Sequence, residues 1–273
     1  MKYFTHNSPK IHQNDWQLDQ VLPIAYQIPA HYLQTATTER QQSFSTLLSR
    51  DVFSEGDAQA LYDYLMQRKT QWSAAFLKML SPWLEDELKH YEALRRTYHV
   101  ISGTSFAAMN QSFHARTHEI EPIAPVLVDE FTILVTLIFD EIGSVYSYRR
   151  DLREYYCHFG PAIQQIGHHL VKDEGTHFNN AAEILLTHHT DRLSQVEPLL
   201  HTIATLETHL GKYYKTFLLD HAQEQFRFPP QFNRVIIQVV LARLGLAQHP
   251  SQTTLRQLWQ WTPPGHTWTP IAS

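Results

Sequence analysis

The apolar residues of this chain recur mostly at intervals of three and four, which is the spacing of one face of an α-helix. The pattern predicts six helices, over residues 39–69, 73–100, 125–155, 161–187, 196–219 and 231–244. The first contains Gly56, where it can kink, and a turn at residues 68–72 would fold the first two into a hairpin. In the second, Pro82 either kinks the helix or, with Ser81 as N-cap, begins a new one.

The helices predict an all-α fold, because no stretch alternates polar and apolar residues for long enough to rival them as a strand. Residues 39–245 are expected to form the helical domain, with a loop at residues 103–122. Residues 1–38 hold three prolines between short apolar groups and are interpreted as an arm packed on the core, with one short helix. Residues 246–273 hold four prolines and three tryptophans, which predicts an irregular tail anchored by aromatic side chains.

Composition argues against several classes of partner. The formal net charge is −5 and no stretch is densely basic, so a nucleic-acid partner is not expected. A single cysteine, Cys157, excludes an internal disulfide framework and fits a reducing compartment. The first ten residues have no apolar signal region, and the apolar run at residues 131–139 is far shorter than a membrane span. We therefore expect a soluble, cytoplasmic protein without a membrane span.

Two short runs carry the candidate chemistry. Glu87 and His90 are three residues apart, and so are Glu174 and His177. On a helix this spacing places both side chains on one face, one turn apart. Because the chain has eighteen histidines, one such match is expected by chance, so the weight falls on the glutamates that accompany each run.

A lone glutamate precedes each run at nearly the same distance, Glu55 before the first and Glu141 before the second. Four helices that each direct a carboxylate inward, two of them with a histidine as well, form the pattern of ferritin-like di-metal bundles. Carboxylates supply hard oxygen donors and imidazoles supply nitrogen donors, a set suited to iron that reacts with dioxygen. The predicted ligands of two iron ions are Glu55, Glu87, His90, Glu141, Glu174 and His177. Asp51 and Asp57 lie close enough to Glu55 to replace it.

Three further side chains are expected beside the ligands. Asp86 and Asp173 each directly precede a ligating glutamate and are the candidates for orienting the histidines. Trp83 lies four residues before Glu87 and faces the same side of its helix. The alternatives are two solvated aspartates and an ordinary core tryptophan.

At these residues the chain resembles the soluble acyl-acyl-carrier-protein desaturases. The similarity covers about residues 45–180 and rests on five short motifs. They are Asp51 four residues before Glu55, the run from Trp83 to His90, the pair Ser102 and Gly103, Glu141 followed by Ser144, and the run from Asp173 to His177. Ser144 stands where that family has threonine, and Asp86 stands where its plant members have glutamate.

The resemblance implies a ferritin-like four-helix bundle with two iron ions, to which this chain adds C-terminal helices. It implies that an electron donor such as ferredoxin reduces the iron, which then activates dioxygen. The resulting oxidant removes hydrogen from an acyl chain on an acyl carrier protein, giving an alkene, or an alcohol if hydroxyl rebounds. It also implies a homodimer. We expect Ser144 to direct protons and oxygen at the metal face, and Asp173 to hold His90 or His177.

A carrier protein is acidic, so its docking surface should be basic. The densest basic group is Arg149, Arg150 and Arg153, at the end of the helix predicted over residues 125–155. The alternative is that these cations stabilise the C-terminus of that helix.

Two other functions fit the ligand pattern. One is a di-iron N-oxygenase or hydroxylase of an amine or polyketide; such N-oxygenases carry an extra histidine one turn before the second Glu-x-x-His motif, where this chain has Leu170 and, one residue off, His169. The other is iron storage or rubrerythrin-like peroxide scavenging. Against it, the chain extends well beyond a bare bundle and has no Cys-x-x-Cys pair.

Overall fold

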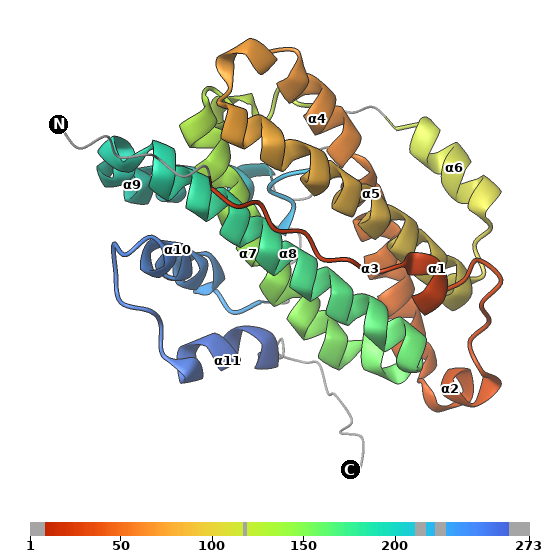
Figure 1. Cartoon of the computed structure of the whole chain (residues 1–273). Helices are drawn as coiled ribbons and strands as arrows, with labels where there is room; N and C mark the ends of the chain where they lie inside the picture. The colour runs from red at the N-terminus through yellow and green to blue at the C-terminus, as the bar shows by residue number, and fades with distance from the viewer. Residues whose placement is uncertain (1–8, 117–118, 211–216, 222–227, 262–273) are drawn as a thin grey trace.

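The computed structural model describes residues 9–116, 119–210, 217–221 and 228–261, and within these ranges every regular element is helical (Figure 1). The predicted all-α fold is therefore confirmed for this part of the chain. The four long helices are α3 (Thr38–Gly56), α5 (Ala74–Ser102), α7 (Glu130–Glu154) and α8 (Pro161–His188). The other helices are α1 (Leu18–Val21), α2 (Ala30–Thr35), α4 (Ala58–Met66), α6 (Phe106–His114), α9 (Val196–Leu210), α10 (Phe232–Arg243) and α11 (Gln252–Gln260).

The long helices pack as two hairpins. Helix α3 lies along α5, α7 lies along α8, and contacts between α5 and α8 join the hairpins (Figure 1). Helices α9, α10 and α11 all pack against α7 and cover it from outside. Helix α7 is long and apolar enough to cross a membrane by length and composition, but most of its apolar stretch is buried inside the protein. Burial of this kind is typical of the central helix of a bundle.

The first predicted helix is broken at Gly56, as its sequence indicated. The break separates α3 from α4, and a Cβ at position 56 would lie 2.6 Å from the ring of Phe113, so no larger residue fits without a shift. A 3₁₀ turn, η1 (Lys69–Gln71), then makes the predicted reversal. Helix α5 begins after Ser73, whose side chain accepts a hydrogen bond from the Phe76 amide, and it continues through Pro82. The alternative of a new helix starting at Ser81 is therefore wrong.

Several helix limits differ from the prediction because capping groups override the apolar pattern. Helix α7 begins at Glu130 rather than near residue 125, since Asp129 and Thr132 form a reciprocal capping box. The expected loop at residues 103–122 contains α6, which Ser105 caps. The expected irregular tail contains α11, which Ser251 caps. These two serines follow a glycine or a proline closely, and that context made both segments read as irregular.

The helix expected over residues 196–219 is shorter than predicted. Helix α9 ends at Leu210, and the described residues 217–219 are not helical; Leu219 has a φ of 62°, in the left-handed region. Residues 211–216 lie outside the described part of the chain, as does the tail from residue 262, which includes Trp268.

The N-terminal segment holds two short helices, α1 and α2, rather than one. Before them, an extended stretch runs over α8 and α5 (Figure 1). Its path is fixed at His12, whose backbone amide donates to Oδ1 of Asn180 at 2.9 Å and whose carbonyl accepts from Nδ2 of Asn180 at 2.7 Å. This stretch reaches the surroundings of the predicted ligands.

Candidate metal centre

All six predicted ligands lie together in the interior of the four long helices. Helix α3 provides Glu55, and α7 provides Glu141. The two Glu-x-x-His motifs lie on α5 and α8, where the spacing of three residues directs both side chains inward. All six side chains are buried, each with less than a tenth of its surface exposed.

The ligand atoms form two overlapping groups of four. The first consists of Glu55, Glu87, His90 and Glu174, and the second of Glu87, Glu141, Glu174 and His177. Within each group the ligand atoms lie within 4.8 Å of one another. Glu87 and Glu174 belong to both groups, so their carboxylates lie between two positions that could each hold a metal ion. We call the first group the His90 half-site and the second the His177 half-site.

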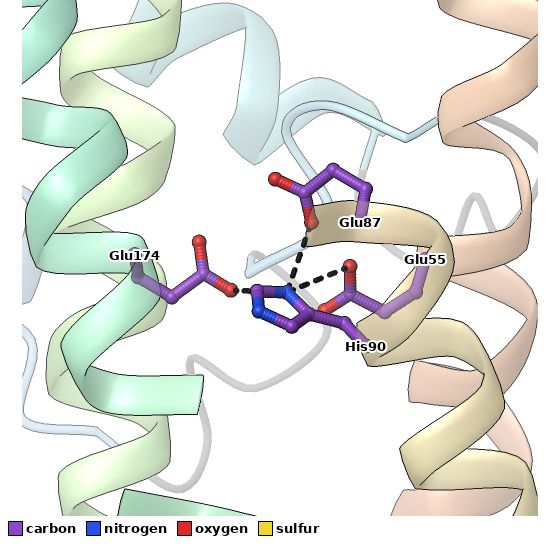
Figure 2. Close-up of side chains that lie close together, drawn as sticks. All are labelled: Glu55, Glu87, His90 and Glu174. Carbon is purple, nitrogen blue, oxygen red and sulfur yellow. Dashed lines mark hydrogen bonds and ion pairs between the residues drawn. The ribbon is translucent and has the colours of Figure 1, made fainter. Parts of the chain in front are cut away.

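Each imidazole directs Nδ1 toward the carboxylates of its half-site. Nδ1 of His90 is 3.0 Å from Glu87, 3.4 Å from Glu174 and 3.9 Å from Glu55 (Figure 2). Nδ1 of His177 is 2.9 Å from Glu87, 3.4 Å from Glu141 and 3.7 Å from Glu174. The two half-sites therefore have similar distances between imidazole and carboxylates.

Three ligand atoms at this centre are buried without a hydrogen bond: Oε2 of Glu55, Oε1 of Glu87 and Nδ1 of His177. The last two are only 2.9 Å apart, yet the contact lacks hydrogen-bond geometry. Buried polar atoms without partners are costly, and each of these could coordinate a cation instead. The arrangement of these atoms therefore suits coordination of metal ions better than hydrogen bonding among the residues themselves.

The proton affinities reflect four carboxylates crowded into the interior. Burial, with repulsion from Glu87 and Glu174, raises the pKa of Glu55 well above its usual range. Burial and the charge of Glu174 raise the pKa of Glu141 to about 8, although His177 opposes the shift. Burial lowers the pKa of each histidine, but nearby carboxylates, Glu87 foremost, outweigh it and raise both values. Without metal, the cluster therefore holds protons that a cation would displace.

The two aspartates expected near the histidines lie against them in a crossed arrangement. Nε2 of His90 on α5 is 3.1 Å from Asp173 on α8, and Nε2 of His177 on α8 is 3.3 Å from Asp86 on α5. These contacts leave each Nδ1 to face the carboxylates, as in carboxylate–histidine–metal triads. Burial raises the pKa of Asp86, but contacts with His177 and Lys89 outweigh it and lower the value to about 2.

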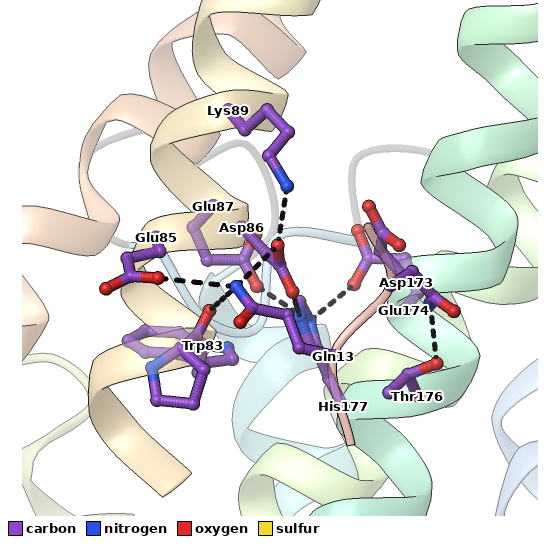
Figure 3. A network of polar contacts seen from close by, with 12 residues as sticks. Gln13, Trp83, Glu85, Asp86, Glu87, Lys89, Asp173, Glu174, Thr176 and His177 are labelled. Atoms are coloured by element: carbon purple, nitrogen blue, oxygen red, sulfur yellow. Dashed lines mark hydrogen bonds and ion pairs between the residues drawn. The ribbon is translucent and has the colours of Figure 1, made fainter. Parts of the chain in front are cut away.

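The N-terminal stretch contacts both aspartates, which sequence reasoning missed. The indole N–H of Trp16 donates to Asp173 at 2.7 Å, and Nε2 of Gln13 donates to Asp86 at 3.1 Å. Figure 3 shows Gln13 reaching between α5 and α8, with Lys89 on the other side of Asp86. No local pattern in the sequence predicts these contacts, because Trp16 and Asp173 are 157 positions apart.

The glutamate of each half-site that is not shared also has a buried aromatic partner. The indole N–H of Trp83 donates to Glu141 at 3.0 Å, so Trp83 lies beside the centre as expected. The hydroxyl of Tyr148 donates to Glu55 in a short hydrogen bond that was not predicted. The two aspartates that could have replaced Glu55 do not do so. Asp57 pairs with Arg116 at 2.7 Å, and neither Asp57 nor Asp51 belongs to a ligand group.

A small pocket of about 50 Å³ adjoins the centre on the side of α3 and α7. Its lining includes Glu55, Glu141 and Glu174, and also Ser144 and Asp51. A volume of this size holds a few molecules as small as water or dioxygen. The structure thus places Ser144 at the pocket but not among the ligand groups.

The three arginines expected to form a basic docking surface do not share a surface. Arg150 is buried, with 1% of its surface exposed, and contacts Asp151 at 2.8 Å. Arg149 and Arg153 are both exposed, and Arg153 pairs with Glu154 at 2.7 Å. Position 150 belongs to the inward face of α7, so only Arg149 and Arg153, which lie one turn apart, remain for the expected basic surface.

Comparison of the chain with protein-family models, with curated proteins and with solved structures found no match.

Proposed function

We propose that this protein is a di-iron oxidoreductase that activates dioxygen with electrons from an external donor such as ferredoxin. The observation that carries the proposal is the pair of four-residue groups that share Glu87 and Glu174. Two shared carboxylates, with one further glutamate and one histidine at each position, correspond to the ligand set of ferritin-like di-metal bundles. The four negative charges balance two divalent ions, which would supply the redox chemistry when bound.

The proposed substrate is an acyl chain on an acyl carrier protein, from which hydrogen is removed. Support comes from three positions that carry the resemblance to the desaturases. Trp83 contacts Glu141, while Asp51 and Ser144 line the pocket one turn from Glu55 and Glu141 respectively. In this proposal Ser144 handles protons at the pocket and Asp173 positions His90.

One observation favours a second candidate, a hydroxylase of a small polar molecule. The pocket is far smaller than the several hundred Å³ of a typical ligand site. Its lining also includes three further carboxylates, Asp140, Asp151 and Asp220. A small polar substrate suits such walls better than a long apolar chain does. An N-oxygenase with an extra histidine ligand is less well supported, because buried Leu170 occupies that position and His169 stacks on Trp16.

The test is to load the protein with ferrous iron, add a ferredoxin-type reductant, and follow dioxygen uptake with acyl carrier substrates and with small amines. Mass spectrometry separates the outcomes: loss of two hydrogens shows desaturation, and gain of one oxygen shows hydroxylation. Dioxygen uptake with neither product, together with elution as a very large assembly, would favour iron storage. A protein that binds iron but takes up no dioxygen would contradict the proposal.

A further inference from the structure

A second buried polar cluster adjoins the pocket beside the metal centre. It contains Ser144 and Asp140 from α7, Glu207 from α9, and His221. Oγ of Ser144 is 3.2 Å from Nε2 of His221. On the other side of the imidazole, Nδ1 is 3.3 Å from Glu207 and 3.8 Å from Asp140. The imidazole thus connects a hydroxyl at the pocket with a carboxylate, Glu207, that does not line it.

The fold holds His221 closely in this place. A Cβ at position 143 would lie only 3.0 Å from the imidazole ring, so Gly143 permits the approach of His221 to α7. Asp140 accepts a hydrogen bond from the Leu219 amide at 2.7 Å, which ties the segment before His221 to the same helix. Glu207 is fully buried and accepts from Asn233 at 3.1 Å. Both carboxylate partners of the imidazole, Asp140 and Glu207, are therefore themselves held by a neighbour.

The proposed reaction needs a source of protons at this pocket. Hydroxylation and desaturation each consume one dioxygen, two electrons from the donor and two protons. Hydroxylation yields the alcohol and one water, and desaturation yields the alkene and two waters. Carboxylates that ligate metal hold no proton, so a group other than the ligands must deliver protons to the pocket.

We propose that His221 and Ser144 form a proton relay into the pocket beside the metal centre. The protonated imidazole donates from Nε2 to Oγ of Ser144, while the Ser144 hydroxyl passes its own proton to a reduced oxygen atom in the pocket. Glu207 is a positioning residue that holds Nδ1 of His221. The inference rests on the proposed function, since it needs a reaction that consumes protons there.

The charges around His221 keep a proton available. Burial lowers its pKa, but Glu207, Asp140 and Asp220 outweigh burial and raise the value to about 10. Glu207 lies close to solvent, because Asn233, which donates to it, lines a groove between α9 and α10 that is open to solvent. The competing proton donors at the pocket are Asp51, whose pKa burial raises to about 7, and Asp140, whose pKa burial raises well above its usual range.

The test compares variants that keep their iron. After anaerobic loading, mixing with dioxygen gives the rate of iron oxidation in a single turnover. We expect His221→Asn and Ser144→Ala each to lower this rate on the order of 100-fold. The double variant, with both His221→Asn and Ser144→Ala, should oxidise iron no more slowly than the slower of the two single variants. Ser144→Thr retains the hydroxyl and should recover most of the rate that Ser144→Ala loses. The matched control is His189→Asn, since His189 contacts Glu130 at 3.1 Å and does not line the pocket.

Imidazole nitrogen resonances give a readout that does not depend on turnover. The signal lost in His221→Asn should belong to a doubly protonated ring at pH 7, and Glu207→Gln should lower the pH at which that ring loses a proton. A parental oxidation rate in His221→Asn, or a larger loss in Asp51→Asn than in His221→Asn, would overturn the relay. If His221→Asn fails to hold iron, the contrast between Ser144→Ala and Ser144→Thr decides, and equal rates overturn the relay. A parent protein that binds no iron would instead contradict the proposed function.

Discussion

The His90 and His177 half-sites have the same ligand types but are held by different neighbours. In the His90 half-site, Asp173 contacts the imidazole and accepts the indole N–H of Trp16, and both of these contacts are buried. In the His177 half-site, Asp86 contacts the imidazole and also pairs with Lys89, whose side chain is 24% exposed. One half-site is therefore fixed by a neutral buried donor, and the other partly by a charge near solvent.

The difference shows which part of the centre the helices alone determine. The ligands come from two hairpins that repeat the same pattern, and the half-sites accordingly match in ligand type and spacing. The neighbours of the two aspartates come in part from the N-terminal stretch, which has no counterpart in the repeat. We infer that the repeat builds the two positions, and that Trp16 of the N-terminal stretch and Lys89 of α5 make them unequal.

The largest expected effect comes from removing a shared carboxylate. Glu87→Ala should abolish binding of both metal ions, whereas Glu55→Ala should leave one ion in the His177 half-site, because Glu87 belongs to both groups and Glu55 to one. Metal content per chain after dialysis distinguishes the two variants. Equal loss in both would contradict the assignment of Glu87 as a shared ligand.

The next largest effect concerns the aspartates behind the histidines. Asp173→Asn should weaken binding in the His90 half-site, and Asp86→Asn in the His177 half-site, each by about 10- to 100-fold. The loss for Asp173 should be the greater, because its carboxylate accepts a second buried hydrogen bond from Trp16. Titration with Co²⁺, followed by visible absorbance, measures both affinities. Unchanged affinities in either variant would show that the crossed contacts do not support the ligands.

Metal binding should release protons at pH 7. The pKa of Glu141 is raised to about 8 and those of both histidines are raised, so these groups hold protons at neutral pH that a cation must displace. Apparent affinity should therefore rise with pH, by about tenfold per pH unit for each proton displaced. Calorimetry in two buffers of different ionisation enthalpy counts the protons. A count of zero at pH 7 would contradict the raised values.

The weakest effects should come from the neighbours of the two aspartates, Trp16 beside Asp173 and Lys89 beside Asp86. Trp16→Phe removes the indole N–H yet keeps a ring over His169, and should weaken the His90 half-site by roughly tenfold at any ionic strength. Lys89→Met removes a partly exposed charge, so its smaller effect on the His177 half-site should disappear in high salt. The same Co²⁺ titration at low and high salt provides the comparison. A strong salt dependence of the Trp16→Phe effect would contradict the assignment of Trp16 as a neutral, buried donor.

The sequence predicted the positions of the ligands better than it predicted their surroundings. Glu87 and His90 lie one turn apart whatever the tertiary structure, so their common face followed from spacing alone. Trp16 and Tyr148 act on Asp173 and Glu55 from distant positions in the chain, and no local pattern encodes such contacts. His221 was missed for the same reason, because it reaches Ser144 across 77 positions.

The helix limits also divide into those that the sequence predicted and those that it did not. The break at Gly56 followed from a single residue. The reversal of the chain before Ser73 followed from the positions of Glu55 and Glu87, because a hairpin centred between them brings both carboxylates to the same height. Helices α6 and α11 were missed because each depends on a serine cap in a segment that also contains glycine or proline. Caps supply the first hydrogen bonds of a helix, and they decide its start where the apolar pattern is weak.

The proposed di-iron centre is tested most directly by the iron content per chain, measured in the parent protein and in Glu174→Ala after expression with ample iron. We expect about two iron ions in the parent and clearly fewer in the variant, since Glu174 belongs to both half-sites. A parent without iron, or a variant with the same iron content as the parent, would contradict the di-iron centre and every function built on it.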